Sequence, residues 1–359
     1  MIFVALSWVG LIILVWRMTP RRARPLALPK GPNPLVSIIV PARNEEKALP
    51  RLLDSLKSLD YPRYEVIVVD DGSTDTTAAV ASAFGARVVS GRSLESGWKG
   101  KQWACWQGVQ QAHGDVFLFT DADTTHDRDS LSRSVQFLRA SGADMLTALP
   151  FHDCLEPWEK LLGPFHVLLL ALTAPYARPR EKRLFAVGQY ILVTKTAYSA
   201  IGGHAGVRDE LVEDLPIANA CIAAGRSFRV FPGERLFRVR MYTSPRAFAA
   251  GWRRNFRAGL GMSTWLAPFE MAAFAAALTG GGQLFSTLWA AFPPLAAIFF
   301  LAWRQRRLGD FHGLGALLAV VNLGVFCYVT ALSVYDMAFG KEMVWKGRAY
   351  APAAGPSRT

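Results

Sequence analysis

Three short apolar runs in the first third of the chain each end in a polar cluster. The runs cover residues 35–40, 65–69 and 116–119, and the clusters that follow them cover residues 41–46, 70–75 and 121–123. Short apolar runs bounded in this way predict buried strands, and the segments between them carry leucines and other apolar residues at helical spacing. Alternating strands and helices predict an α/β fold with a doubly wound, mostly parallel central sheet of the Rossmann-like kind. Because ligands of such sheets bind at the carboxyl ends of the strands, we expect the three clusters to form one site.

The third cluster contains two carboxylates one residue apart, Asp121 and Asp123. Side chains at positions i and i+2 of an extended segment lie on the same side of the backbone. Such a pair suits a hard divalent cation, which takes oxygen ligands and completes its shell with water and substrate phosphates. An isolated Asp-X-Asp is more often a solvated turn, but its place at the end of a predicted strand favours a site for Mg²⁺ or Mn²⁺.

Other polar residues extend this interpretation. If the cation holds a diphosphate, the acidic turn at residues 70–72 reaches the base and the ribose, because carboxylates accept hydrogen bonds from their hydroxyl and N–H groups. Lys101 is placed to neutralise phosphate charge and so to stabilise a departing nucleoside diphosphate. The adjacent Glu213 and Asp214 are the best candidates for a general base, although a surface acidic pair remains an alternative on spacing alone.

The two ends of the chain are apolar and flanked by basic residues. Residues 2–16 are almost wholly apolar, and positive charge follows the run instead of preceding it, which favours an uncleaved anchor with a cytoplasmic catalytic domain. The run is short for a span, so an interfacial or cleaved segment stays open. Residues 265–303 and 314–339 form a second apolar region, interrupted by the basic stretch 304–307. We therefore expect a multi-pass protein of the cell membrane, in which the number of spans is open.

The formal net charge of +12 is compatible with nucleic acid, a membrane surface or a phosphorylated substrate as partner. The basic residues flank apolar segments instead of lining one folded face, which argues against a nucleic-acid partner. The four cysteines form no Cys-X-X-Cys pair, so they indicate neither a zinc site nor a disulfide framework.

The ordered set of motifs Val40-Pro41-Ala42-Arg43-Asn44-Glu45-Glu46, Val69-Asp70-Asp71-Gly72-Ser73-Thr74-Asp75 and Asp121-Ala122-Asp123 resembles glycosyltransferase family 2, the inverting nucleotide-sugar enzymes with the GT-A fold. The Glu213-Asp214 pair matches the position of the catalytic base in that family. The resemblance covers about residues 35–260. It implies an anchor at 1–17, a basic Pro-rich linker at 18–34, the GT-A domain at 35–260, membrane helices at 261–340 and a tail at 341–359.

Finer motifs are similar to the branch that contains the 4,4′-diaponeurosporenoate and hopene-associated glycosyltransferases. They comprise residues 97–104, 202–204 and 237–242 and the Trp-Lys-Gly-Arg string at 345–348. Enzymes of that branch are membrane-anchored and place a sugar on a terpenoid lipid. The Gln-X-X-Arg-Trp string of processive polysaccharide synthases is absent from this sequence, and the comparable stretch reads Gly251-Trp252-Arg253-Arg254. One sugar per turnover is therefore expected.

The resemblance implies roles for single residues. Pro41, Arg43 and Glu45 line the nucleotide, Asp71 contacts the uracil or ribose, Lys101 lies near the diphosphate, Asp121 and Asp123 bind the sugar-nucleotide and the cation, Asp214 takes the proton of the acceptor, and Trp252 and Arg254 bind the acceptor or the diphosphate. Trp345, Lys346 and Arg348 are expected to close over the site, and His204 is either structural or lines the acceptor mouth.

The implied reaction is transfer of one sugar, by default glucose from a UDP-sugar, to a hydrophobic lipid such as a carotenoid acid or another terpenoid. A glycerolipid, a sphingolipid-like lipid or a polyprenyl phosphate is the alternative acceptor, and a non-catalytic membrane protein that binds nucleotide-sugars is the alternative of a different class. A nucleotidyltransferase also uses metal-bound carboxylates on an α/β sheet, but it tends to open with a Gly-rich loop, and none follows the first predicted strand.

Overall fold

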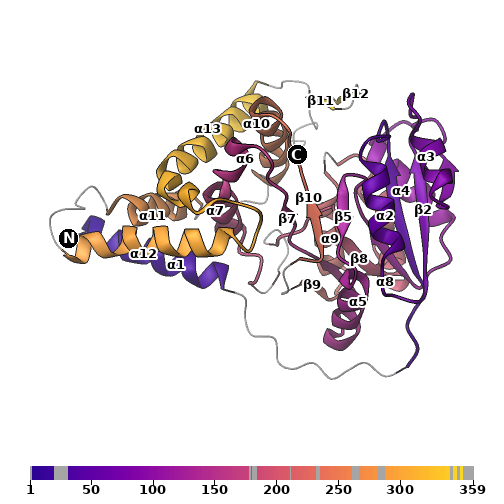
Figure 1. The fold of residues 1–359 in the computed structure, drawn as a ribbon, viewed down its shortest axis with the longest axis horizontal. Helices are drawn as coiled ribbons and strands as arrows, with labels where there is room; N and C mark the ends of the chain where they lie inside the picture. The colour runs from indigo at the N-terminus through magenta and orange to yellow at the C-terminus, as the bar shows by residue number, and fades with distance from the viewer. Residues whose placement is uncertain are drawn as a thin grey trace, which may run out of the picture.

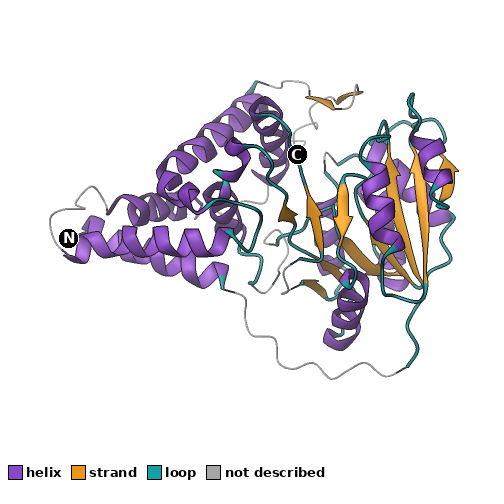
Figure 2. Cartoon of the chain, in the orientation of Figure 1, coloured by secondary structure: helices purple, strands orange, loops and turns teal. Residues whose placement is uncertain are grey.

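The chain folds into a sheet domain and a helical bundle, which lie side by side in the computed structural model (Figure 1). The structure describes residues 2–19, 31–177, 179, 184–210, 212–231, 235–260, 267–280, 288–339, 343–345 and 348–350. All strands of the large sheet belong to the first part, and the second part consists of helices drawn from both ends of the chain and from its middle (Figure 2).

The large sheet has seven strands in the order β3-β2-β1-β4-β8-β6-β9. These are β1 (Val36–Ala42), β2 (Tyr64–Asp70), β3 (Arg87–Ser90), β4 (Val116–Phe119), β6 (Met145–Thr147), β8 (Ile191–Thr194) and β9 (Phe228–Val230). All pairings are parallel except the two made by β8, which runs antiparallel to β4 and to β6. The predicted mostly parallel α/β sheet is therefore confirmed, and the three polar clusters follow β1, β2 and β4, which are neighbours in the sheet.

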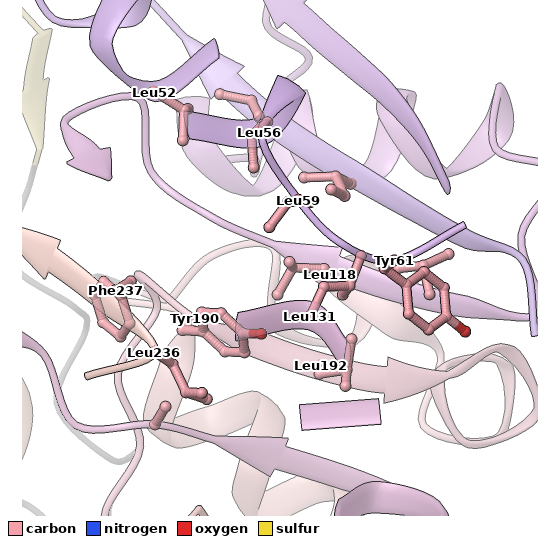
Figure 3. Close-up of a cluster of buried hydrophobic side chains, with 14 of the residues drawn as sticks. Leu52, Leu56, Leu59, Tyr61, Leu118, Leu131, Tyr190, Leu192, Leu236 and Phe237 are labelled. Atoms are coloured by element: carbon pink, nitrogen blue, oxygen red, sulfur yellow. The ribbon is translucent and has the colours of Figure 1, made fainter. Parts of the chain in front are cut away.

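Helices cover both faces of this sheet. Successive residues of β1 point to opposite faces, so that Ile38 packs with α2 (Leu49–Lys57) and α5 (Ser130–Ser141), while Ile39 packs with α4 (Gly100–Gln110) and α9 (Asp214–Ala223). Figure 3 shows the core of the first face, where leucines from α2, β4 and β8 surround Tyr190. The Oη atom of Tyr190 lies 2.7 Å from Ser134 Oγ, which satisfies both buried hydroxyls.

A second, smaller sheet lies at the side of the large sheet that faces the bundle (Figure 1). It has the order β5-β10-β7, with β5 at Thr124–His126, β10 at Phe237–Val239 and β7 at Phe151–His152. The other elements of the sheet domain are α3 (Thr77–Ala83), α8 (Lys195–Ala200) and the 3-10 helix η1 (Gly203–Val207), whereas the short helix α6 (Pro157–Lys160) lies within the helical bundle (Figure 1). The strands β11 (Met343–Trp345) and β12 (Arg348–Tyr350) form a separate two-stranded sheet.

The bundle brings together helices that are far apart in sequence. Besides α6, its members are α1 (Ile2–Met18), α7 (Gly163–Thr173), α10 (Pro245–Leu260), α11 (Ala267–Thr279), α12 (Leu288–Gln305), the 3-10 helix η3 (Gly313–Leu318) and α13 (Ala319–Ala338). Helix α1 packs along α11 and α12, and α10 packs along α13 (Figure 1). An ion pair joins α10 to α13, because the Arg253 guanidinium of α10 lies 2.6 Å from the Asp336 carboxylate of α13.

The multi-pass arrangement expected from the sequence is not supported. Among the described residues, one helical segment, Gly313–Ala338, is long and apolar enough to cross a membrane. Helix α1 has 17 residues, which at about 1.5 Å each gives about 25 Å, short of the about 30 Å of a hydrocarbon core. Helix α1 carries apolar side chains on two sides. One side packs inside the bundle, where Leu14 is buried, and the other faces outward, where Ile12 is 62% exposed.

The contact between α4 and the sheet leads to a stability prediction. A Cβ atom on Gly108 of α4 would lie 2.6 Å from Ile39 Cγ2 and 3.0 Å from Val69 Cγ2. We expect Gly108→Ala to lower the free energy of unfolding by about 1–3 kcal/mol, because overpacking forces these strands and the helix apart.

The matched control is Gly324→Ala on α13, where an added Cβ has open space and improves helix propensity. Thermal unfolding of the full chain in detergent tests the pair. Equal unfolding midpoints for the two variants would contradict the close packing of α4.

Candidate functional site

A cavity of about 1290 Å³ opens at the carboxyl ends of β1, β2 and β4 and continues into the helical bundle. Eleven of the site residues named from the sequence line it: Pro41, Arg43, Glu45, Asp71, Lys101, Asp121, Asp123, Glu213, Asp214, Trp252 and Arg254. The residues come from positions 41 to 254, so the fold gathers in one place what the sequence spreads over most of the chain.

The loops after β1 and β2 form one wall of the cavity. The Asn44 backbone N–H donates to Ser73 Oγ at 3.0 Å, and the Thr74 backbone N–H donates to Asn44 Oδ1 at 2.8 Å. Asn44 has a positive φ of 55°, a conformation that asparagine tolerates better than most residues. The Arg43 guanidinium donates to the Asp71 carbonyl at 3.3 Å. The first two polar clusters are therefore bonded to each other and present their side chains as a unit.

Lys101 joins two carboxylates from different elements. Its Nζ atom lies 2.7 Å from Asp121 Oδ1, at the end of β4, and 2.6 Å from Glu213 Oε1, just before α9. Burial by itself would lower the pKa of Lys101, but the charges of Asp121 and Glu213 raise it well above its ordinary value. Burial by itself would raise the pKa of Glu213. The positive charge of the Lys101 ammonium has the larger effect, so the pKa of Glu213 lies below its ordinary value. Lys101 and Glu213 are therefore both charged at neutral pH.

Gly188 allows this contact to form. A Cβ at that position would lie 2.4 Å from Glu213 Oε1 and 3.0 Å from Lys101 Nζ. Any side chain there would displace the ion pair. Strand β8 begins at Ile191, so Gly188 belongs to the preceding loop, which reaches into the cavity.

Asp214 begins helix α9 beside this ion pair. Its Oδ1 accepts from the Leu215 backbone N–H at 2.7 Å, and its Oδ2 accepts from the Gly188 backbone N–H at 3.2 Å. Burial, followed by the negative charge of Glu213, raises the pKa of Asp214 to about 6. The sequence predicts a helix over 207–224, but the chain forms η1 and a turn before α9, which starts at Asp214. The carboxylate thus stands at a helix start, held by two backbone donors and able to exchange a proton near neutral pH.

Asp121 and Asp123 follow β4 and both face the cavity. The part of the chain that the structure describes holds no group of three or more His, Cys, Asp or Glu side chains that could bind a metal ion. Two carboxylate ligands nevertheless fit a hard cation whose remaining oxygen ligands come from a bound phosphate group and water. The Asp121–Asp123 pair therefore suits a cation that binds together with a phosphate-containing substrate. It suits a cation that the protein holds permanently less well.

Helix α10 brings two further residues to the cavity. Trp252 is buried, and its Nε1 atom has no hydrogen-bond partner among the residues that the structure describes. Arg254 lies close enough to Asp121, Glu213 and Asp214 for their charges to act on it, although burial keeps its pKa below the usual range. Arg254 therefore adds a guanidinium whose charge acts on the carboxylates of the cavity.

His204 does not line the cavity. It is 2% exposed, and its Nδ1 lies 2.8 Å from Tyr198 Oη. Burial lowers its pKa to about 4, so the ring is neutral. Of the two interpretations that the sequence left open, the structural one is correct. Lys346 and the side chains of Trp345 and Arg348, which the sequence placed over the site, lie outside the described residues.

The sequence interpretation missed the part of the cavity that lies in the bundle. Its wall includes Leu169 and Leu172 of α7, Met271 of α11, and Phe326 and Cys327 of α13. The all-round apolar character of residues 161–172 was the available signal, because a helix apolar on every side is buried or faces lipid. It does not reveal that the helix borders a cavity.

Comparisons with known proteins agree with this geometry. The sequence profile described as "Glycosyl transferase family 2" matches residues 37–215. A 4,4′-diaponeurosporenoate glycosyltransferase from Staphylococcus haemolyticus is 28% identical over 331 residues, with 88% of each chain covered. One of the same name from Staphylococcus aureus is 32% identical over 232 residues, covering 63% of this chain and 62% of that one.

Among solved structures, a mannosyltransferase from Pyrobaculum calidifontis in complex with GDP-Man and Mn²⁺ superposes with a TM-score of 0.56 at 19% identity. The superposition covers 93% of this chain and 98% of that chain. At this identity the likeness concerns the fold alone, and it confirms the expected GT-A-like arrangement.

The bridging role of Lys101 gives a stability prediction. Lys101→Met leaves Glu213, whose side chain is 8% exposed, without its counter-charge. We expect a loss of about 2 kcal/mol, below the range for a fully buried pair because Lys101 itself is 32% exposed.

The double variant Lys101→Met/Glu213→Gln removes the lone carboxylate and should regain part of that loss. Thermal unfolding of the single and double variants measures both effects. A double variant less stable than Lys101→Met would show that Glu213 does not depend on Lys101.

Proposed function

Since the chain belongs to glycosyltransferase family 2, we propose that it moves one sugar from a nucleotide-sugar to a lipid acceptor, with inversion at the anomeric carbon. The single observation that carries this proposal is the continuity of the cavity. One end holds the carboxylates, Lys101 and Arg254, and the other end is walled by apolar side chains of the bundle. A cavity of this kind suits one charged substrate and one apolar substrate that meet at Asp214.

The charged end is assigned to the donor. Asp71, which is 8% exposed, lies at the end of β2, where it suits the ribose or the base, with Pro41, Arg43 and Glu45 beside it. Lys101 and Arg254 supply positive charge for the diphosphate. The GT-A-like structure from Pyrobaculum calidifontis holds GDP-Man, which supports a nucleotide-sugar as donor. UDP-glucose is the specific donor that we propose, on the family resemblance.

Asp121 and Asp123 are the residues that would hold Mg²⁺ or Mn²⁺, and the same solved structure contains Mn²⁺. When bound, the cation would offset the negative charge of the diphosphate. Lys101 contacts Asp121 through Oδ1, so the lysine also fixes the orientation of this carboxylate. Metal dependence is part of the proposal.

Asp214 is the proposed catalytic residue. Its two backbone hydrogen bonds hold the carboxylate in place, and its pKa of about 6 leaves it ionised at pH 7 but basic enough to accept a proton. With a hydroxyl acceptor it removes the proton as the oxygen attacks the anomeric carbon. A carboxylic acid acceptor is already ionised at pH 7, and Asp214 then orients it instead.

A carotenoid acid is the acceptor that we propose, because two similar proteins carry the name 4,4′-diaponeurosporenoate glycosyltransferase. Other terpenoids, glycerolipids and polyprenyl phosphates remain alternatives. The apolar end of the cavity favours all of these over a soluble sugar.

Membrane association of the full chain is also proposed. Large apolar side chains are exposed on α1, α12 and α13, among them Trp16 (60%), Leu295 (65%), Phe299 (77%) and Val321 (60%). Apolar surface of this extent on one part of a molecule marks an interaction site, and a lipid layer suits its length and composition. A cytoplasmic catalytic domain follows from the basic residues after α1.

Mass spectrometry of lipids tests the reaction. The wild-type chain and its Asp214→Asn variant are expressed in a host that makes carotenoid acids and hopanoids. We expect a hexosyl-lipid with the wild type and a loss of about 100-fold or more with the variant if Asp214 is the base. Equal product from both chains would remove Asp214 as base, and no product from either would contradict a terpenoid acceptor.

The carboxylate of Glu213, next to Asp214, leads to a prediction for the pH dependence of sugar transfer. With a hydroxyl acceptor, Asp214 must be ionised to act as the base, so transfer to such an acceptor should rise with pH through about 6 and then level off. Burial and the charge of Glu213 both raise the pKa of Asp214, so Glu213→Gln should lower this pKa and move the rise to lower pH. The pH dependence of kcat/KM for both chains is the measurement. If the rise of kcat/KM in the Glu213→Gln variant occurs at the same pH as in the wild type, or at a higher pH, Glu213 does not raise the pKa of Asp214.

A further inference from the structure

The apolar end of the cavity reaches the surface of the bundle, and we propose that the acceptor enters there, sideways from a lipid layer, between α11 and α13. We call this opening the portal and define it by five lining residues, Ala267, Pro268, Cys327, Thr330 and Ala331. The inference rests on the proposed function and adds the route and the form in which the acceptor arrives.

The first observation is that the portal residues belong both to the cavity and to the surface. Cys327 and Ala331 on α13 and Pro268 on α11 are exposed, and all three line the cavity that also contains Asp214. The side chains of these three residues are small. One cavity therefore reaches from residues exposed on the outer face of the bundle to the Asp214 carboxylate.

The second observation concerns the surface around the portal. The neighbouring large side chains are apolar or aromatic and exposed: Phe269 on α11 (52%), and Tyr328 (61%), Val334 (50%) and Tyr335 (45%) on α13. Helix α13 belongs to the one described segment that is long and apolar enough to cross a membrane. An opening rimmed by such side chains suits the hydrocarbon side of a lipid layer better than water.

The third observation is the chemistry of the inner wall. Behind the portal, Met271, Leu172 and Phe326 offer only apolar surface. Glu270 also lines this part, but its carboxylate is paired with the Arg17 guanidinium at 2.5 and 2.7 Å. The same guanidinium donates to the Ala171 carbonyl at 3.1 Å, so it ties α1 to the end of α7. The charge on this wall is neutralised within the protein, which favours an apolar chain over an anionic headgroup.

Together these observations assign an orientation to the acceptor. Its reacting end lies at Asp214, and its hydrocarbon body lies between α7, α11 and α13 and extends through the portal. Such an acceptor never has to cross water, because it moves from the lipid layer into the cavity directly. The long apolar body, and not only the reacting group, then contributes to binding.

Narrowing the portal tests the route. Ala331→Trp fills the opening, and Val321→Trp is the matched control, because Val321 lies on the same helix, is 60% exposed and does not line the cavity. Both chains are compared in phosphatidylcholine vesicles that contain a long-chain carotenoid acid. We expect Ala331→Trp to lower kcat/KM for the lipid by about tenfold or more, chiefly through KM, with nucleotide-sugar affinity unchanged. Wild-type kinetics for Ala331→Trp, or an equal loss with Val321→Trp, would overturn the proposal.

A second measurement does not depend on turnover. Cys327 is exposed, whereas Cys105, Cys154 and Cys221 are buried, so a maleimide should alkylate Cys327 alone. The probe is retinoic acid, a polyene with a terminal carboxyl group, and acetate is its control because it has the same carboxyl group without the chain. We expect retinoic acid to slow alkylation severalfold and acetate to leave it unchanged, with Cys327→Ala giving no labelled product.

The two measurements separate the portal from the reaction. If the wild type binds no nucleotide-sugar and transfers no sugar, the proposed function fails, and protection of Cys327 alone decides whether the portal takes an apolar acid. If transfer occurs but retinoic acid leaves Cys327 fully reactive, the proposed function stands and the portal is wrong.

Discussion

The ammonium group of Lys101 is the charge on which the arrangement of the site depends. It lies within 2.7 Å of carboxylates from two separate elements, the end of β4 and the start of α9. Without it, the like charges of Asp121 and Glu213 would repel each other. The position of Asp214 follows from this contact, since Asp214 is adjacent to Glu213 and its carboxylate accepts from Gly188, the residue that also makes room for the ion pair. A site for a charged substrate can therefore be preformed before that substrate binds.

Local patterns in the sequence predict the sheet and its polar edge well. The run at residues 116–119 is β4 without a shift, and β1 and β2 begin and end within two residues of the expected runs. These elements are predictable because burial on both faces demands apolar residues at every position, and because a strand must end where polar residues begin. The contact of Lys101 with Glu213 is not predictable in this way, since it depends on how α4 and α9 pack on the same face of the sheet. The start of α9 at Asp214 is not predictable from the local pattern either, because the 3-10 helix η1 and a turn take up the residues before it.

The apolar ends of the chain illustrate a different limit. Composition shows that these segments avoid water, but it does not say whether they face lipid or one another. In the structure α1 does both, because one side packs on α11 and α12 while Ile12 and Trp16 are exposed. The Arg17–Glu270 pair then fixes α1 against the wall of the cavity, so that residues from the beginning of the chain and from its last third shape the same site. An N-terminal segment that looks like a simple anchor is therefore part of the architecture around the cavity.

The central claim is that the charged end of the cavity binds a nucleotide-sugar with a divalent cation. Titration calorimetry of the full chain in detergent, with UDP- and GDP-sugars in the presence and absence of Mn²⁺, tests it most directly. The account predicts saturable binding of one of these donors that requires Mn²⁺ and is lost in an Asp121→Asn/Asp123→Asn variant of normal stability. Absence of binding by every donor in the presence of Mn²⁺, or binding that the variant retains in full, would contradict it.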